Sequence, residues 1–178
     1  MTTNKIQTRF ILALAGCLMT SFLWAQGDKS KRPSPPATAS GKVKGANITI
    51  NYSSPAVKGR TIFPDLHPYG EVWRAGANEA TLFETDRDIK VEGKTLPAGK
   101  YSLYAIPGEK EWTIIFNKQT GQWGVKRGGV TSRDEAQDAL TVQAKPKKTG
   151  LTERMAYEVN DRGFVLRWEN VEVPVSIK

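Results

Sequence analysis

Alternating apolar and polar residues predict β-strands along most of the chain after residue 40. In residues 46–52, Ile48, Ile50 and Tyr52 alternate with polar neighbours, which is the period of a strand with one buried face. Similar runs occupy residues 80–85, 88–92, 100–106, 111–117, 140–144, 155–159, 164–168 and 171–177. Many short strands separated by turn-forming residues are typical of an antiparallel β-sandwich or a partly open barrel.

Residues 132–139 are the one stretch with helical features. Ser132 and Glu135 have the spacing of a capping box at a helix start. The stretch is short and has few apolar residues, so we expect a single helical turn or a loop. The expected fold is therefore all-β with at most one short helix, and the absence of a repeating βαβ pattern disfavours a Rossmann-type fold.

The first 25 residues have the features of an export signal. Lys5 and Arg9 precede an apolar run that ends in the small residue Ala25. The run is shorter than the roughly 20 residues of a membrane-spanning helix. We therefore expect a signal peptide over residues 1–25, no transmembrane span in the mature protein, and a periplasmic or secreted location.

Residues 14–17 offer a second interpretation of the same segment. Leu-Ala-Gly-Cys matches a bacterial lipobox, in which cleavage before Cys17 places a lipid anchor on its thiol. The residues that follow Cys17 are apolar, whereas lipoproteins usually continue into a polar tether. Soluble export is therefore favoured over a membrane-anchored lipoprotein.

A spacer separates this signal from the predicted domain. Residues 26–40 contain three prolines and no large apolar residue, which predicts a flexible linker. Residues 41–178 then form a single β-rich domain, long enough for one hydrophobic core. The signal and the linker carry half of the formal net charge of +8. The basic clusters of the domain lack interleaved aromatic residues, so nucleic-acid binding is not predicted.

Composition limits the available chemistry. The chain has one cysteine and one histidine, which excludes an intramolecular disulfide and a zinc site built from Cys and His. No serine lies in a Gly-x-Ser-x-Gly motif. We therefore predict no catalytic residue, no cofactor and no metal site.

Residues 53–78 interrupt the strand pattern. Prolines and glycines alternate there with large apolar residues that can anchor a long loop to the core. The loop also collects the residues with the most chemical capability, among them the only histidine, His67. A pinned loop of this composition is a candidate binding element.

Several motifs in and after this loop occur in one fixed order. They occupy residues 55–60, 68–81, 96–113, 116–118 and 122–124. These motifs resemble the domain-of-unknown-function family 2911 over nearly all of residues 40–178. The resemblance implies a β-rich fold and an exported protein of the Gram-negative envelope, mostly in Bacteroidetes. It implies no established activity, so function has to be argued from the residues.

The candidate ligand site centres on the end of the loop. Trp73 offers a flat apolar face, Arg74 a fork of hydrogen-bond donors, and Asn78 and Glu79 can bond hydroxyl groups, as a sugar or a small carboxylated ligand requires. The alternative is structural, with Trp73 in the core, Arg74 paired with Glu79 and Asn78 in a turn. The remaining candidate residues are Arg60, His67, Tyr69 and Trp123.

Catalysis requires partners that the sequence does not establish. His67 can act as a general base only if a neighbour such as Asp65 or Glu71 orients it. Glu71 and Glu79 can serve as the carboxylate pair of a glycosidase only at a suitable separation.

The sequence thus favours an exported envelope protein with a non-catalytic binding domain for a small polar ligand, a carbohydrate or a partner protein. One alternative is a hydrolase that uses His67 or a carboxylate pair. Another is a purely structural envelope domain.

Overall fold

The computed structural model describes residues 28–178, and residues 33–178 form one compact unit. The predicted signal peptide and Cys17 lie outside the described residues. The unit before it ends in a short helical turn, η1 (Lys29–Lys31), where the Asp28 carboxylate accepts a hydrogen bond of 3.0 Å from the Ser30 N–H.

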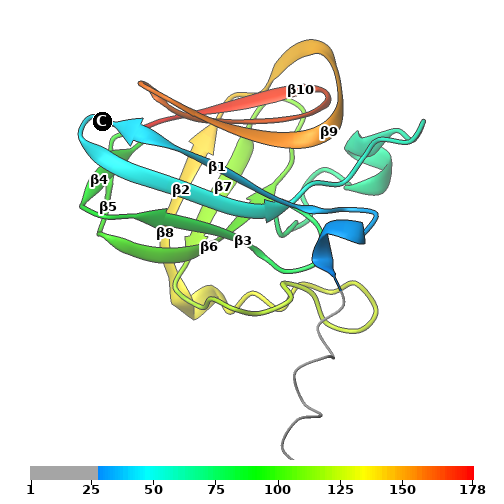
Figure 1. Ribbon diagram of the computed structural model, residues 1–178, viewed down its shortest axis with the longest axis horizontal. Coiled ribbons are helices and arrows are strands. Elements are labelled where there is room, and N and C mark those ends of the chain that lie inside the picture. The colour runs from blue at the N-terminus through cyan, green and yellow to red at the C-terminus, as the bar shows by residue number, and fades with distance from the viewer. Residues whose placement is uncertain (1–27) are drawn as a thin grey trace, which may run out of the picture. The chain divides into compact units, whose positions relative to one another are not determined.

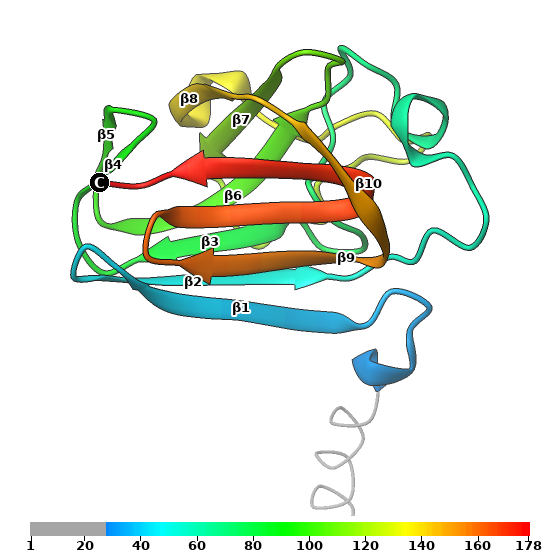
Figure 2. The same ribbon diagram turned by 90° about the horizontal axis from the view of Figure 1, so that it is seen from above.

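Antiparallel strands build the compact unit (Figure 1). They are β1 (Pro36–Val43), β2 (Ala46–Ser53), β3 (Thr81–Thr85), β4 (Ile89–Val91), β5 (Lys94–Leu96), β6 (Gly99–Ile106), β7 (Trp112–Asn117), β8 (Asp138–Ala144), β9 (Lys147–Asn160) and β10 (Gly163–Ser176). Six of them form one sheet in the order β1-β2-β3-β6-β7-β8, while β9 pairs with β10 and β4 with β5. The β9–β10 pair lies over one face of the six-stranded sheet in both views (Figures 1 and 2). The predicted all-β antiparallel sandwich is confirmed.

Strand β10 doubles back on itself near Glu169. This residue has a positive φ of 54°, and the pairing with β9 shifts register on either side of it. Figure 2 shows the two halves of β10 side by side, and the Ile177 N–H reaches the Arg162 carbonyl at 2.7 Å. Ile177 also bridges to Val91 of β4. The second layer therefore consists of β9, β10 and the β4–β5 hairpin.

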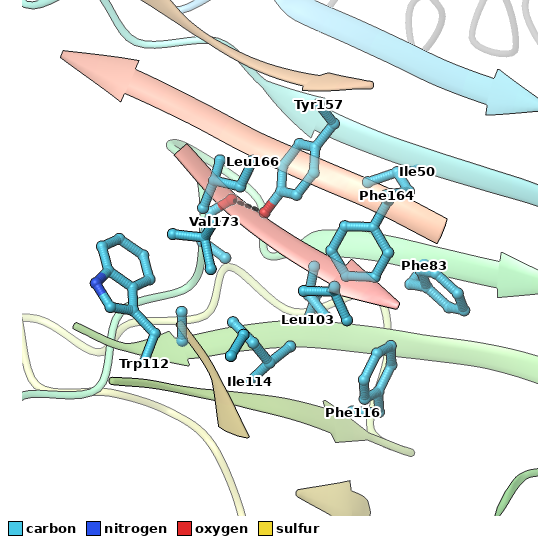
Figure 3. Close-up of a cluster of buried hydrophobic side chains, with 14 of the residues drawn as sticks. Ile50, Phe83, Leu103, Trp112, Ile114, Phe116, Tyr157, Phe164, Leu166 and Val173 are labelled. Carbon is cyan, nitrogen blue, oxygen red and sulfur yellow. Dashed lines mark hydrogen bonds between the residues drawn. The ribbon is translucent and has the colours of Figure 1, made fainter. Parts of the chain in front are cut away.

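The core fills the space between the two layers (Figure 3). The six-stranded sheet contributes residues such as Phe83, Leu103 and Phe116, and β9 and β10 contribute Tyr157 and Phe164. Each large side chain buried in this way contributes about 1.5–3 kcal/mol to stability. The buried Tyr157 hydroxyl is not left unpaired, because it donates a hydrogen bond of 2.9 Å to the Ala75 carbonyl.

Strand β6 is buried on both faces. Leu103 packs in the core between the layers, whereas Tyr104 points to the opposite face and is also fully buried. There the Gln122 amide donates to the Tyr104 hydroxyl at 2.9 Å, so residues 118–133 cover this part of the outer face. A strand with both faces covered loses its alternation, which explains why residues 103–106 are all apolar whereas residues 100–103 still alternate.

Three local predictions need correction. The predicted linker at residues 26–40 is wrong at its C-terminal end, because β1 begins at Pro36 and pairs along its whole length with β2. An edge strand tolerates proline at its first residue, and its pairing comes from backbone hydrogen bonds rather than from large side chains. The single helical turn expected within residues 132–139 is present as η3 (Glu135–Gln137), but its cap is Asp134 and not the predicted Ser132. The strand pattern also missed residues 94–96, which form the short strand β5 and pair with β4.

No helix among residues 28–178 is long and apolar enough to cross a lipid bilayer.

Candidate functional site

The loop between β2 and β3 is held against the sandwich at several points. Trp73 forms an antiparallel bridge with Ala105 of β6, with N···O distances of 2.7 and 2.8 Å. The Gly70 N–H donates to the Pro107 carbonyl at 2.9 Å. Earlier in the loop, an irregular turn, η2 (Ile62–Leu66), buries Ile62 and Phe63. These anchors give the polar residues of the loop defined positions.

A pocket of about 420 Å³ lies beside this loop. Its wall is drawn from the loop, from β10 and from the segment after β7, which are far apart in the sequence. The lining residues are Ser34, Pro55, Arg60, Leu66, His67, Pro68, Glu71, Val72, Trp73, Arg74, Gly76, Ala77, Val125, Gly129 and Trp168.

Stacked aromatic rings form the inner wall of the pocket. The rings of Trp73 and Trp168 lie 5.7 Å apart and nearly parallel, and the His67 ring lies 4.7 Å from that of Trp73. Only 4% of Trp73 is exposed, and its indole N–H donates to the Gly76 carbonyl at 3.0 Å. The buried indole N–H of Trp168 has no acceptor among the described residues. Trp73 is thus a core residue whose edge reaches the pocket.

His67 is neutral at physiological pH. Burial lowers the pKa of its imidazole from 6.5 to about 4, and the positive charges of Arg74 and Arg60 act in the same direction. Within residues 28–178 no side chain or backbone group forms a hydrogen bond with either ring nitrogen. The ring therefore has one donor and one acceptor available.

Two guanidinium groups flank this neutral ring. Arg60 donates from Nε to the Val57 carbonyl at 3.0 Å and from Nη2 to the Ala56 carbonyl at 2.6 Å. Arg74 is half-buried and donates from Nη1 to the Trp123 carbonyl at 3.0 Å. In the described part of the chain neither group is within ion-pair distance of a carboxylate.

The electrostatic balance of the pocket is positive. Burial lowers the pKa of the Arg74 guanidinium below its usual value, while the negative charge of Glu79 acts in the opposite direction. An arginine remains protonated in spite of such a shift. Glu71 is the one acidic residue among the described lining residues of the pocket, which include two arginines.

Four of the eight predicted site residues meet in this pocket. They are Arg60, His67, Trp73 and Arg74. The ring of Trp123 lies outside the lining, 5.7 Å from the Arg74 guanidinium carbon.

Three predicted residues lie elsewhere. Tyr69 is exposed and Glu79 is partly buried. Asn78 adopts a positive φ of 57° and donates to the Ser34 carbonyl at 2.9 Å, as the structural alternative for this residue requires.

The arrangement offers little to the hydrolase alternative. Glu71 lines the pocket and Glu79 does not, so the two carboxylates do not share this site. Among residues 28–178, no carboxylate forms a hydrogen bond or an ion pair with His67. Among the described residues, no three His, Cys, Asp or Glu side chains form a group that can hold a metal ion.

Sequence reasoning missed the parts of the pocket that come from distant segments. Ser34 lay in the predicted linker, Trp168 lay in the predicted strand at residues 164–168, and Val125 and Gly129 belong to the segment after β7. The one available signal was Trp123 beside several glycines, which marked that segment as an irregular loop near the site.

A family comparison identifies the chain. A family model described as a protein of unknown function (DUF2911) matches residues 34–177. The chain belongs to the DUF2911 family. No curated protein and no solved structure matches it.

The DUF2911 match and the pocket coincide. All the lining residues, from Ser34 to Trp168, fall within the matched range, and so does β1. The pocket is therefore a feature of the DUF2911 domain itself rather than of the preceding segment.

Proposed function

We propose that the DUF2911 domain binds a small organic carboxylate in this pocket and carries out no reaction on it. The observation that carries the proposal is a pair of arginines, Arg60 and Arg74, that line the same pocket as the neutral imidazole of His67 and have no ion-pair partner among residues 28–178. The signal peptide predicted for residues 1–25 supports a place for this function in the cell envelope.

Donors outnumber acceptors in the pocket. Arg60 and Arg74 use only some of their N–H groups in hydrogen bonds to backbone carbonyls, so each has donors available for a ligand. A planar guanidinium matches the two oxygens of a carboxylate, and such charge-assisted bonds are stronger than neutral ones. His67 adds one donor without adding positive charge. An anion satisfies this set better than a neutral polyol does.

The other lining residues indicate the chemistry of the part of the ligand that lies beyond its carboxylate. Leu66, Val72 and Val125 present apolar surface, and the edges of Trp73 and Trp168 extend it. A volume of about 420 Å³ lies in the range of small-molecule pockets, roughly 300–1,000 Å³. Glu71 can accept a hydrogen bond from a hydroxyl or amino group of the ligand. The expected ligand therefore has one carboxylate, an apolar body and at most a few polar groups.

Matched acids and amides test this proposal. Thermal shift and calorimetric titration with benzoate, hexanoate and glucuronate, each compared with its uncharged amide, measure the preference for a carboxylate. We expect at least one acid to bind and its amide to bind much more weakly. Arg74→Gln is expected to weaken binding of that acid about tenfold or more, because it removes a charge-assisted contact.

Arg162→Gln is the matched control, because this arginine lies in the exposed turn between β9 and β10, away from the pocket. It is expected to leave the affinity unchanged. The proposal is wrong if the amides bind as well as the acids, or if no acid binds at millimolar concentration.

A further inference from the structure

Large apolar side chains are exposed on both sides of the pocket mouth. On one side, 41% of Leu66 and 43% of Tyr69 are exposed, and on the other side 48% of Trp123 and 64% of Val130. They lie around one opening: Leu66 lines the pocket, and Tyr69 follows the lining residue Pro68. Trp123 contacts the lining residue Arg74, and Val130 follows the lining residue Gly129. Such residues are usually buried, and a group of them at one site marks an interaction surface.

The segment on the second side is also strongly basic. Residues 118–133 contain Lys118, Lys126, Arg127 and Arg133 and no acidic residue. Arg133 is partly buried and pairs with Asp138. The other three are exposed, and in the described part of the chain they form no ion pair.

The same basic character continues across the pocket. Lys58 and Arg60 are exposed on the loop between β2 and β3, and neither forms an ion pair within residues 28–178. Asp65, Glu71 and Glu79 are the acidic residues of this loop, which also contains Arg74. Basic side chains thus exceed acidic ones around the mouth.

The basic segment can present its side chains outward. Gly121, Gly128 and Gly129 all have positive φ, and a Cβ added at any of them would meet no atom within 4 Å. The backbone therefore turns at open positions, with Trp123 between Gly121 and Gly128 and Val130 directly after Gly129. Neither of these two side chains belongs to the buried core of residues 28–178.

We propose that this end of the sandwich docks on an anionic lipid surface. Tryptophan and tyrosine prefer the level of the lipid headgroups, and leucine and valine can insert just below it. Lysine and arginine beside them are attracted to the negative surface potential. The combination of exposed apolar residues with unpaired bases matches an anionic membrane in both chemistry and charge. The proposal does not depend on the carboxylate-binding function, because the basic residues 118, 126 and 127 do not line the pocket.

The test uses residues 33–178, which form a compact unit that contains the whole buried core. The apolar run of the first 25 residues would bind vesicles by itself. Sedimentation with phosphatidylglycerol vesicles and with phosphatidylcholine vesicles measures the bound fraction. We expect binding to the anionic vesicles, weaker binding to the neutral ones and a decrease with added salt.

Two kinds of variant separate the charged and the apolar contributions. The double variant Lys126→Glu with Arg127→Glu is expected to lower the partition coefficient about tenfold or more, because each base near an anionic surface adds appreciably to binding. Val130→Ser is expected to lower it without changing the salt dependence.

Arg162→Glu serves as the control for charge reversal. Its turn joins β9 to β10 at the end of these strands that lies beside the C-terminus, away from the pocket loops (Figure 2). It is expected to leave vesicle binding nearly unchanged, and unfolding midpoints show whether each variant is folded. The proposal is overturned if anionic vesicles do not bind the parent protein, or if Arg162→Glu lowers binding as much as the double variant does.

Discussion

The imidazole of His67 is expected to titrate near pH 4 instead of near 6.5. Burial against the rings of Trp73 and Trp168 removes water from the charged form, and Arg74 and Arg60 repel the proton. The chain has one histidine, so a proton NMR titration follows a single imidazole signal without ambiguity. A midpoint near 6.5 would contradict the enclosed pocket described above.

The same shift predicts how stability depends on pH. Above about pH 6.5 the ring is neutral in both the folded and the unfolded chain, so the free energy of unfolding does not depend on pH through His67. Between 6.5 and about 4 the unfolded chain binds a proton that the folded protein does not, so the free energy of unfolding falls as the pH falls. Below about pH 4 both forms are protonated and the loss stays constant. The loss amounts to roughly 3 kcal/mol for the full shift.

Comparison with His67→Gln isolates this contribution from that of the carboxylates. Glutamine keeps hydrogen-bonding capacity but does not titrate. We expect the stability of the parent relative to the variant to fall by about 3 kcal/mol between neutral pH and pH 4, measured by urea denaturation at each pH. Parallel pH profiles for the two proteins would show that His67 is not protected from protonation.

The two predictions for His67 also bear on the proposed ligand. A carboxylate bound between Arg60 and Arg74 offsets their positive charges, which lower the pKa of His67. The NMR midpoint is therefore expected to rise when a binding carboxylate is added, and to stay in place with the corresponding amide. A rise with the acid but not with the amide would show that the charge of the bound ligand acts on the imidazole of His67.

The sequence predicted the fold well wherever one face of a strand is buried. Residues 46–52 show this clearly, because burial alternates along β2. The prediction failed at Pro36, where an edge strand depends on backbone pairing, and small side chains leave no hydrophobic pattern. The same holds for a strand as short as β5, because three residues are too few to show a hydrophobic pattern.

The site was predicted only where it is local in sequence. Arg60, His67, Trp73 and Arg74 lie in one loop with unusual composition, so their proximity could be inferred. The contribution of Trp168 could not, because only the packing of β10 against the loop brings it to the pocket. The burial that changes the pKa of His67 depends on the same long-range contacts and has no local signature.

Gly163→Ala is expected to destabilise the domain strongly. Gly163 begins β10 with a φ of +146°, a conformation that side chains disfavour. An added Cβ would lie 2.0 Å from the Val175 carbonyl oxygen and 2.9 Å from the Ile177 nitrogen, both backbone atoms of the second half of the strand. Relief of this clash requires the C-terminal segment to move away, which breaks the 2.7 Å hydrogen bond from Ile177 to Arg162.

The displacement extends beyond one hydrogen bond because the same segment joins the β4–β5 hairpin to the second layer. Ile177 bridges to Val91, and Lys178 and Lys90 exchange backbone hydrogen bonds of 2.8 and 2.9 Å. Ile177 and Val91 are both core residues, so their separation also exposes apolar surface. We expect a loss of at least about 3 kcal/mol in the free energy of unfolding, measured by urea denaturation.

Gly150→Ala provides the matched control on the neighbouring strand. Gly150 lies in β9 without a left-handed φ, and an added Cβ meets no atom within 4 Å. The same chemical change is therefore expected to alter the free energy of unfolding by no more than about 0.5 kcal/mol. The comparison removes the general effect of replacing glycine, which also changes the entropy of the unfolded chain. Equal stabilities for the two variants would mean that the C-terminal half of β10 does not pack against Gly163.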